Sequence, residues 1–305
     1  MLVFSTSDKG GTGRSVTSCN IAYRLSLTGR HVAYLDFDFG SPTSGAVFEI
    51  AEINRGTDEG DGLHCYLLGE SSGVGKHDVR KETGRHGLRA PRHPYRLVLY
   101  AGDRGGGEFP ATEEVVQRCT ELLVTCEQEF DVTFVDLSAG RSAALEIALG
   151  ATAQPQLRET VVRWLVFHRW TSQHIVAAHA LVHGPHGVLN TGEDWTHDRP
   201  RLESAIRYVR TAVPSITAPA APGTGTGPQW AWLHEQHAAL RRLAAAHELG
   251  SSVVLGETPV EPVLQWREQV ILDADVQAEI ANADIVLAFT ELAEGLVDDA
   301  VWERL

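Results

Sequence analysis

Short apolar runs alternate with longer amphipathic segments along most of the chain. The apolar runs predict strands, and the segments between them carry apolar residues at helical spacing. The expected strands are 2–5, 31–35, 96–100, 132–136, 163–167, 206–213 and 252–255, and the expected helices are 15–27, 113–130, 172–182, 230–249 and 283–296. This alternation predicts an α/β fold: a doubly wound, mostly parallel sheet with helices on both faces.

Two segments interrupt the alternation. Residues 54–94 are rich in glycine, histidine and charged residues, and their periodicity fades, so we expect an exposed insertion or mobile loop. Residues 214–228 are rich in proline, glycine and threonine and predict a flexible loop. A chain of 305 residues can form one large domain or two modest ones. We interpret it as a single domain over residues 1–305.

A glycine-rich turn joins the first expected strand to the first expected helix. Residues 7–15 read SDKGGTGRS. This context is typical of a phosphate-binding loop, because glycines let backbone N–H groups converge on phosphate and the helix N-terminus adds partial positive charge. The hydroxyl of Ser15 is placed for Mg²⁺. The dinucleotide pattern GxGxxG is not matched, since Val16 stands in place of its third glycine.

The common phosphate-loop pattern GxxxxGK[ST] is not matched either. Asp8 replaces its first glycine and Arg14 replaces its lysine. Arginine keeps the positive charge, but its planar guanidinium is wider than a lysine ammonium. Asp8 adds negative charge near the phosphates, which opposes anion binding unless the side chain turns away or pairs with Lys9 or Arg14.

The remaining motif, KGGxGRS, resembles the deviant phosphate loop of the ParA/MinD-type ATPases, whose pattern is KGGxGK[ST]. In that family the lysine before the glycines reaches across a nucleotide-sandwich dimer to the partner's phosphates, and Lys9 matches it. Three further segments are similar to that family: YLDFDFG at 34–40, VTFVDLSAG at 132–140, and VVLGETPVEPVLQWREQVIL at 253–272. The last resembles the strand and loop that flank adenine.

The resemblance implies a SIMIBI-like P-loop NTPase fold with ATP and Mg²⁺ as cofactors. It implies Lys9 and Asp38 as catalytic residues, with Asp38 supporting hydrolysis. It also implies that Mg²⁺ is held by Ser15, Asp36 and Asp136, in line with the preference of hard cations for carboxylates. The residues that it implies for the nucleotide are Lys9, Gly10, Gly11, Thr12, Gly13, Arg14, Ser15, Val16, Pro259 and Val260.

The function implied by this resemblance is that of a nucleotide-dependent switch. Such a protein binds ATP, forms a homodimer on binding it, and hydrolyses it slowly to ADP and phosphate. It positions or regulates a protein partner. Arg14 leaves an alternative open, a non-hydrolysing nucleotide-sensing or interaction module with a degenerate phosphate loop. Retention of Lys9, Ser15 and the three aspartates argues against a relic.

Charge and composition disfavour two other classes of partner. A net charge of −14 opposes binding to the phosphate backbone of DNA, which needs a basic face. No apolar run approaches the ~20 residues of a membrane span, and the acidic closing segment LAEGLVDDAVWERL would be repelled by anionic lipid. With no signal peptide and four cysteines lacking metal-like spacing, we expect a soluble, cytoplasmic protein with free thiols.

One segment concentrates histidine and tryptophan, FHRWTSQHIVAAHALVH at 167–183. His179 and His183 lie one helical turn apart, which suits zinc. No third ligand is obvious, so ordinary helix histidines are the preferred interpretation. A contact between a protein partner and the HRW residues 168–170 is a second hypothesis for this segment.

Overall fold

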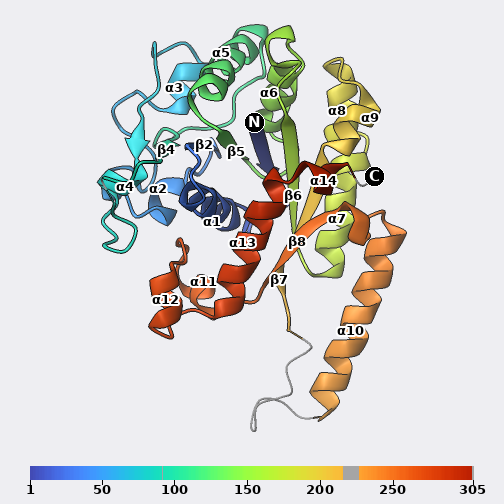
Figure 1. Ribbon diagram of the computed structural model, residues 1–305. Coiled ribbons are helices and arrows are strands. Elements are labelled where there is room, and N and C mark those ends of the chain that lie inside the picture. Colours follow the sequence, from blue (N-terminus) through green and yellow to red (C-terminus); the bar gives the residue numbers. More distant parts are fainter. Residues whose placement is uncertain (91, 216–226, 304–305) are drawn as a thin grey trace.

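The computed structural model describes residues 1–90, 92–215 and 227–303. Its centre is an eight-stranded sheet with the spatial order β3-β4-β2-β5-β1-β6-β7-β8 (Figure 1). The strands are β1 (Leu2–Thr6), β2 (Val32–Phe37), β3 (His77–Asp78), β4 (Leu97–Tyr100), β5 (Val132–Leu137), β6 (Val162–Arg169), β7 (Ile206–Val213) and β8 (Val254–Pro259). The β3–β4 pair is antiparallel, and the other neighbouring pairs are parallel.

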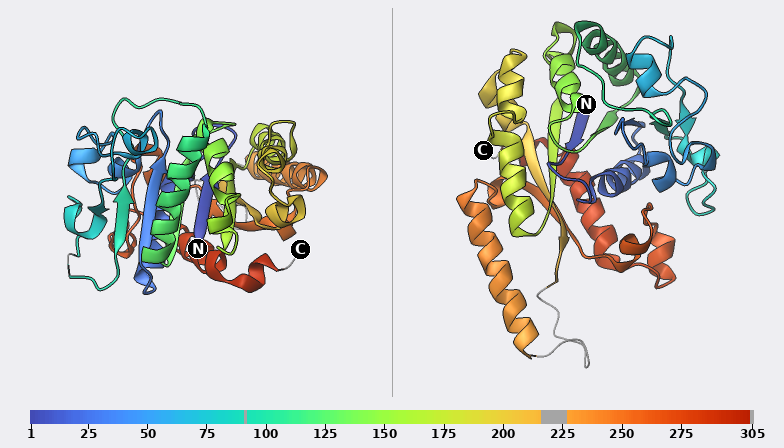
Figure 2. Two further views of the ribbon diagram at one scale, coloured as in Figure 1. Left: turned by 90° about the horizontal axis from the view of Figure 1, so that it is seen from above. Right: turned by 180° about the vertical axis from the view of Figure 1, so that it is seen from behind.

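Helices cover both faces of this sheet. They are α1 (Arg14–Leu27), α2 (Ser44–Val47), α3 (Leu63–Leu67), α4 (Val79–Glu82), α5 (Glu113–Glu129), α6 (Ala143–Thr152), α7 (Ser172–His183), α8 (Val188–Asp194), α9 (Arg199–Ser204), α10 (Gly227–Ala246), α11 (Pro262–Trp266), α12 (Asp273–Gln277), α13 (Ala283–Val297) and α14 (Asp299–Trp302). Helices α1 and α13 lie on one face of the sheet and α5 to α8 on the other (Figure 2). Their apolar residues belong to the two separate cores on these faces. The predicted doubly wound α/β fold is confirmed.

Continuous apolar runs form the central strands because both of their faces are buried. Every residue of β1, β2 and β5 is buried. Successive side chains of a strand point to opposite faces. Phe4 therefore stacks on Trp164 on one face, with ring centroids 4.6 Å apart, whereas Tyr34 stacks on Phe134 on the other at 6.0 Å.

Helix α1 begins directly after the glycine-rich turn. Gly13 takes a left-handed φ of 76°, which lets the chain enter the helix one residue earlier than the sequence predicts. Gly29, with a φ of 96°, follows the helix as expected of a C-terminal glycine. Polar residues of this buried helix find partners: the Ser18 hydroxyl donates to Ser5 Oγ at 2.8 Å, and Asn20 Nδ2 donates to the Gln269 carbonyl at 3.1 Å.

The described part of residues 54–94 contains short elements that the sequence does not predict. These elements are α3, β3 and α4, and four apolar side chains of the segment are buried: Leu63, Leu67, Val79 and Leu88. These four side chains are not exposed, whereas the expectation of an exposed insertion or mobile loop near 54–94 stays a prediction for the segment as a whole. The physical reason for their burial is that each short element packs its few apolar residues against a distant part of the chain, which local periodicity does not reveal.

The region after β7 is described only in part. β7 has the bounds that the sequence predicts, and α10 begins at Gly227. Most of the loop expected at 214–228, residues 216–226, lies outside the described residues. Within the described ranges, no helix combines the length and apolar character needed to cross a bilayer.

The carboxyl ends of the parallel strands share one edge of the sheet. From β1 the chain proceeds to β2 and β4 on one side, and after β5 it crosses to β6, β7 and β8 on the other. Ligands of open α/β sheets bind outside the carboxyl ends of strands where the order reverses in this way. The glycine-rich loop, which follows β1, lies at this point.

Candidate nucleotide-binding site

The loop between β1 and α1 has the geometry of a phosphate cradle. Gly11 and Gly13 take left-handed φ angles of 70° and 76°, which favour glycine. A Cβ atom added at Gly10 or Gly11 would meet no atom within 4 Å, so this part of the loop borders open space. Backbone N–H groups at the start of α1 adjoin that space, and a helix N-terminus attracts anions. These features fit the phosphates of a nucleotide.

The loop is tied to strands on both sides. The carbonyl oxygen of Thr12 accepts a 2.6 Å hydrogen bond from the hydroxyl of Thr211 on β7. The N–H of Gly140, after β5, donates to the carbonyl of Ser7 at 2.7 Å. Val16 is buried in the first turn of α1. These contacts hold the loop over the carboxyl ends of the central strands.

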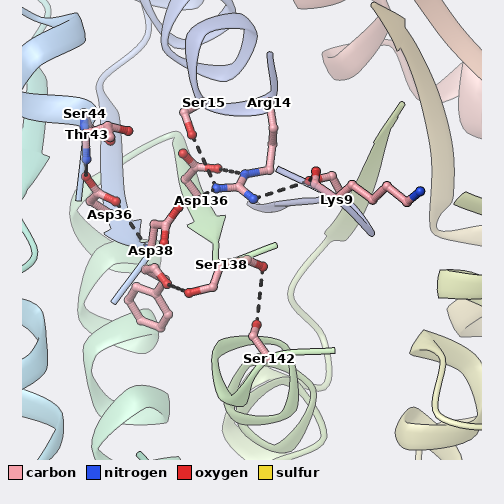
Figure 3. Close-up of polar contacts among 12 residues, drawn as sticks. Lys9, Arg14, Ser15, Asp36, Asp38, Thr43, Ser44, Asp136, Ser138 and Ser142 are labelled. Carbon is pink, nitrogen blue, oxygen red and sulfur yellow. Dashed lines mark hydrogen bonds and ion pairs between the residues drawn. The ribbon is translucent and has the colours of Figure 1, made fainter. Parts of the chain in front are cut away.

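Arg14 points into a group of carboxylates at the end of the sheet. Its side chain is 6% exposed, its Nε lies 2.6 Å from Asp136 Oδ1, and its Nη2 lies 3.1 Å from Asp38 Oδ2 (Figure 3). Weaker contacts join Nη2 to the hydroxyl of Ser15 at 3.4 Å and Nη1 to that of Ser7 at 3.5 Å. The guanidinium thus joins the carboxylates that follow β2 and end β5.

Electrostatics favour this arrangement. Burial by itself lowers the pKa of Arg14, but the charges of Asp136 and Asp38 outweigh it and raise the pKa above its ordinary value. Burial also raises the pKa of Asp38, and attraction to Arg14 offsets only part of that effect. The second oxygen of Asp136 accepts a 3.0 Å hydrogen bond from the hydroxyl of Tyr34. Both oxygens of the Asp136 carboxylate therefore accept hydrogen bonds from side chains of the protein.

Asp36 makes a different set of contacts. Its Oδ2 accepts hydrogen bonds from the N–H groups of Thr43 and Ser44, at 3.0 and 2.9 Å, at the start of α2. Its Oδ1 receives a longer one, 3.3 Å, from the N–H of Asp38. Burial and the nearby charge of Asp136 raise the pKa of Asp36 to about 7. Asp36 thus fixes the loop that follows β2.

The residues predicted to hold Mg²⁺ do not fit the ion in this arrangement. Mg²⁺ requires oxygen ligands at about 2.0–2.1 Å in octahedral geometry. The carboxylate of Asp136 is instead bound by Arg14 and Tyr34, and that of Asp36 by backbone N–H groups. The hydroxyl of Ser15 faces the guanidinium as well. Arg14 thus places a positive charge of the chain itself where the sequence predicts the cation.

Lys9 and Asp8 are separate from this group. Lys9 is exposed, and its side chain extends away from Arg14 and the carboxylates (Figure 3). Asp8 accepts a 2.9 Å hydrogen bond from Arg141, so its negative charge pairs with neither of the two cations considered from the sequence. Arg141 follows the loop after β5. Its ion pair removes an obstacle to anion binding at the loop.

The remaining predicted nucleotide residues lie further along the same edge. Pro259 ends β8, and Val260, which is 44% exposed, follows it and donates its N–H to the carbonyl of Val213. In the sheet order, β6 and β7 separate β8 from β1. The assignment of Pro259 and Val260 to the adenine base stays a prediction.

The hypothesis of a partner contact at residues 168–170 is wrong for two of them. His168 and Trp170 are only 1% and 5% exposed. Burial lowers the pKa of His168 to about 4, which keeps the ring neutral. The indole N–H of Trp170 donates to Nδ1 of His237 on α10 at 3.1 Å. Trp170 thus connects the end of β6 to α10, and neither residue faces solvent.

Tyr34, Arg141 and Thr211 are site residues that the sequence did not indicate. Tyr34 resembles any aromatic residue of a buried strand, so no local signal separates it from the core. The basic side chain of Arg141, directly after the small-residue loop at 138–140, was a signal that could have been used. The role of Thr211 depends on β7 lying close to the loop, which only the fold reveals.

Comparison with known proteins agrees with this geometry. A profile of the CobQ/CobB/MinD/ParA nucleotide binding domain matches residues 3–291. An iron-sulfur cluster carrier protein of Pseudomonas fragi is 43% identical over 54 residues, which span 18% of this chain and only 19% of that protein. The match therefore covers about a fifth of that relative's length.

Solved structures extend the likeness to the whole fold. Apo McdA of Cyanthece has a TM-score of 0.59 and 14% identity, with coverage of 97% of this chain and 98% of that one. The MinC:MinD cell division complex of Aquifex aeolicus gives 0.58 and 15%, with coverage of 97% and 95%. At such identities the likeness shows a shared fold.

Proposed function

This chain belongs to the CobQ/CobB/MinD/ParA family of nucleotide-binding domains, and we propose that it is an ATP-dependent switch that dimerises on binding nucleotide and acts on a protein partner. The phosphate cradle at Gly10–Gly13 supports the binding of a nucleotide. The proposed contacts to the nucleotide are those expected from the sequence, except for the side chain of Arg14, which Asp38 and Asp136 engage. Backbone N–H groups of the loop are the main phosphate donors.

The observation that carries the proposal is that two basic side chains of one loop have different surroundings. Arg14 is buried in ion pairs with Asp38 and Asp136, whereas Lys9 is exposed and extends away from them. A cation that remains available beside a phosphate loop can reach phosphates, either in its own site or in that of a second copy. We therefore assign Lys9 to the phosphates across a two-fold dimer, as the family resemblance implies.

Dimerisation has an electrostatic cost in this chain. Each protomer carries a net charge of −14, so two copies repel each other. The nucleotide must therefore supply the contacts that outweigh this repulsion, with Lys9 as the bridging charge. This requirement makes association depend on nucleotide, which is the property that a switch needs.

A protein partner is the proposed target of the switch. The solved MinC:MinD complex of Aquifex aeolicus pairs the MinD of that organism with another protein. For this chain, the net charge of −14 disfavours DNA and anionic membranes as targets. We propose a protein whose position or activity changes with the nucleotide state.

Hydrolysis is proposed to be slow. Phosphoryl transfer depends mainly on positioning and on neutralising charge. Asp38, the residue expected to orient the attacking water, is engaged by Arg14 at 3.1 Å. We therefore expect turnover below the ~1–100 s⁻¹ of efficient phosphotransfer enzymes. The same ion pair favours the second candidate, a nucleotide sensor that binds ATP without hydrolysing it.

The test combines ATP binding with phosphate release. Bound ATP raises the melting temperature by linkage, and multiple-turnover phosphate release is then compared between the wild type and Asp38→Ala, with and without candidate partners. Release above the Asp38→Ala background supports the slow ATPase. Binding and dimerisation without release support the sensor. The absence of any thermal shift at millimolar ATP contradicts both.

A further inference from the structure

Two helices bring three metal-ligating side chains together, away from the phosphate loop. His179 and His183 lie one turn apart on α7, and Glu248 follows the end of α10. One potential ligand atom from each residue lies within 4.8 Å of the other two. His183 Nε2 and Glu248 Oε2 are 3.9 Å apart. Because 65 residues separate His183 from Glu248, the sequence could not reveal this third ligand.

We propose that His179, His183 and Glu248 bind one divalent transition-metal ion, with Zn²⁺ the best match. Two imidazoles and one carboxylate form a known three-ligand zinc set, which leaves a fourth position for water. Zn–N bonds of about 2.0–2.1 Å place tetrahedral donors ~3.3 Å apart. The three side chains therefore need to close by roughly an ångström. The Glu248 side chain, 71% exposed, has room to rotate inwards.

Among the residues that the structure describes, one ring nitrogen of the histidine pair lacks the contact that a satisfied core histidine would make. The two rings stack at 4.7 Å with an interplanar angle of 25°. Within the described part of the chain, Nδ1 of His179 is buried and has no hydrogen-bond partner. Buried ring nitrogens are nearly always paired, and a coordinated metal supplies such a partner.

Glu248 is held in an uncommon backbone conformation. Its φ of 62° lies in the left-handed region that usually favours glycine after a helix. A glutamate at this position accepts backbone strain and places a carboxylate beside α7. His247 provides a third imidazole nearby, since its ring centroid is 5.2 Å from that of His179.

The position of the site indicates what the metal would do. Of the described α10 residues, only Ala244 is buried, and the helix projects from the body of the molecule (Figures 1 and 2). Its middle is attached through the hydrogen bond between Trp170 and His237. A metal at His179, His183 and Glu248 would fasten the carboxyl-terminal end of α10 to α7. This connection lies away from the phosphate loop, so its test needs no nucleotide.

The experiment titrates untagged, metal-free chain with Co²⁺, read by its visible d–d absorption, and with Zn²⁺, read by calorimetry. We expect one ion per wild-type chain and a rise in melting temperature on binding. His179→Ala, His183→Ala and Glu248→Ala should each weaken the affinity more than about tenfold, since even outer-shell partners of a metal contribute 10- to 100-fold. His234→Ala, an exposed histidine of α10, is the matched control and should bind as wild type does.

Other histidines provide background binding, so the result is read as the difference between variants. Equal stoichiometry and affinity in the wild type and His179→Ala/His183→Ala overturn the proposal. Unchanged affinity in Glu248→Ala overturns it as well, since the third ligand would then be absent. If the double variant does not fold, His183→Gln and Glu248→Gln carry the comparison. ATP binding should be unaffected in all of these variants. The metal titration therefore tests the metal site independently of the proposed nucleotide switch.

Discussion

Nε of Arg14 lies 2.6 Å from Oδ1 of Asp136, although 122 residues separate the two in the sequence. The pair joins the start of α1 to the end of β5, directly beneath the phosphate loop. Asp136 is one of the two carboxylates that the family resemblance implies for Mg²⁺. The chain thus carries, as part of its own loop, a positive charge at the place where the family resemblance implies a metal ion.

Removal of that charge should destabilise the protein. Arg14→Ala leaves Asp136 and Asp38 facing each other without a cation, and breaking a buried ion pair typically costs ~3–5 kcal/mol. We expect about 3 kcal/mol, the lower end of that range, because the Asp38 side chain is 24% exposed and water can reach it. Urea denaturation measures the change in the free energy of unfolding.

The same variant gives a second readout. Without the guanidinium, the carboxylates are open to a metal ion, so millimolar Mg²⁺ should raise the melting temperature of Arg14→Ala but not that of the wild type. Equal responses of the two proteins to Mg²⁺ would show that Arg14 does not occupy the cation's place.

Lys9→Ala should abolish ATP-dependent dimerisation without changing the stability of the fold. Lys9 is exposed, so its removal should leave the free energy of unfolding nearly unchanged. Light scattering with ATP should show dimers for the wild type and monomers for Lys9→Ala. Lys81→Ala, a surface lysine with a 58% exposed side chain on α4, is the control and should dimerise normally. If the oligomeric state changes neither with ATP nor with the Lys9→Ala substitution, the proposed nucleotide-dependent dimerisation is contradicted.

Asp36 should make stability depend on pH. Its pKa is about 7 in the folded chain and near 3.9 when unfolded, so the folded state holds a proton that the unfolded state releases. Stability therefore falls as pH rises from about 4 to 7, by at most ~4 kcal/mol from this group. Asp36→Asn, which carries no charge, should flatten that slope in thermal melts. If the melting temperatures of the wild type and Asp36→Asn change with pH in parallel, Asp36 is not the source of the pH dependence.

The fold was largely predictable because its strands are continuous apolar runs. β1, β7 and α13 lie within a residue or two of their predicted bounds. α6 was missed because its sequence, AALEIALGAT, is apolar on nearly every side and shows little periodicity. The short elements within residues 54–94 were missed for the opposite reason, since they are fixed by contacts with distant segments.

The candidate site was predictable only in its local part. The glycine-rich loop and its place after β1 follow from adjacent residues. The partner of Arg14 does not, because several aspartates are candidates and nearness in the sequence favours Asp8. In the fold Asp8 pairs with Arg141, 133 residues away. Charge pairs of this kind depend on which strands lie side by side, and the order of the sheet decides that.

Asp38→Ala tests the proposed catalytic residue. Its carboxylate is expected to orient water, so the variant should lose phosphate release while it keeps ATP binding and dimerisation. Asp58→Ala, which removes a surface carboxylate with a 58% exposed side chain, is the control and should release phosphate at the wild-type rate. Hydrolysis by Asp38→Ala as fast as by the wild type would show that the second aspartate of the YLDFDFG segment has no catalytic role.

The most direct test of the role of Arg14 is the Mg²⁺ dependence of ATP affinity, measured by calorimetry in excess Mg²⁺ and in chelator. If the guanidinium takes the cation's place, the wild-type dissociation constants for ATP in excess Mg²⁺ and in chelator should agree within a factor of about three. This corresponds to a difference in binding free energy of less than ~1 kcal/mol. Arg14→Lys, whose compact ammonium cannot engage both carboxylates, should bind more than about tenfold more weakly in chelator, a difference of ~1.4 kcal/mol. A tenfold loss of affinity by the wild type in chelator would contradict the account.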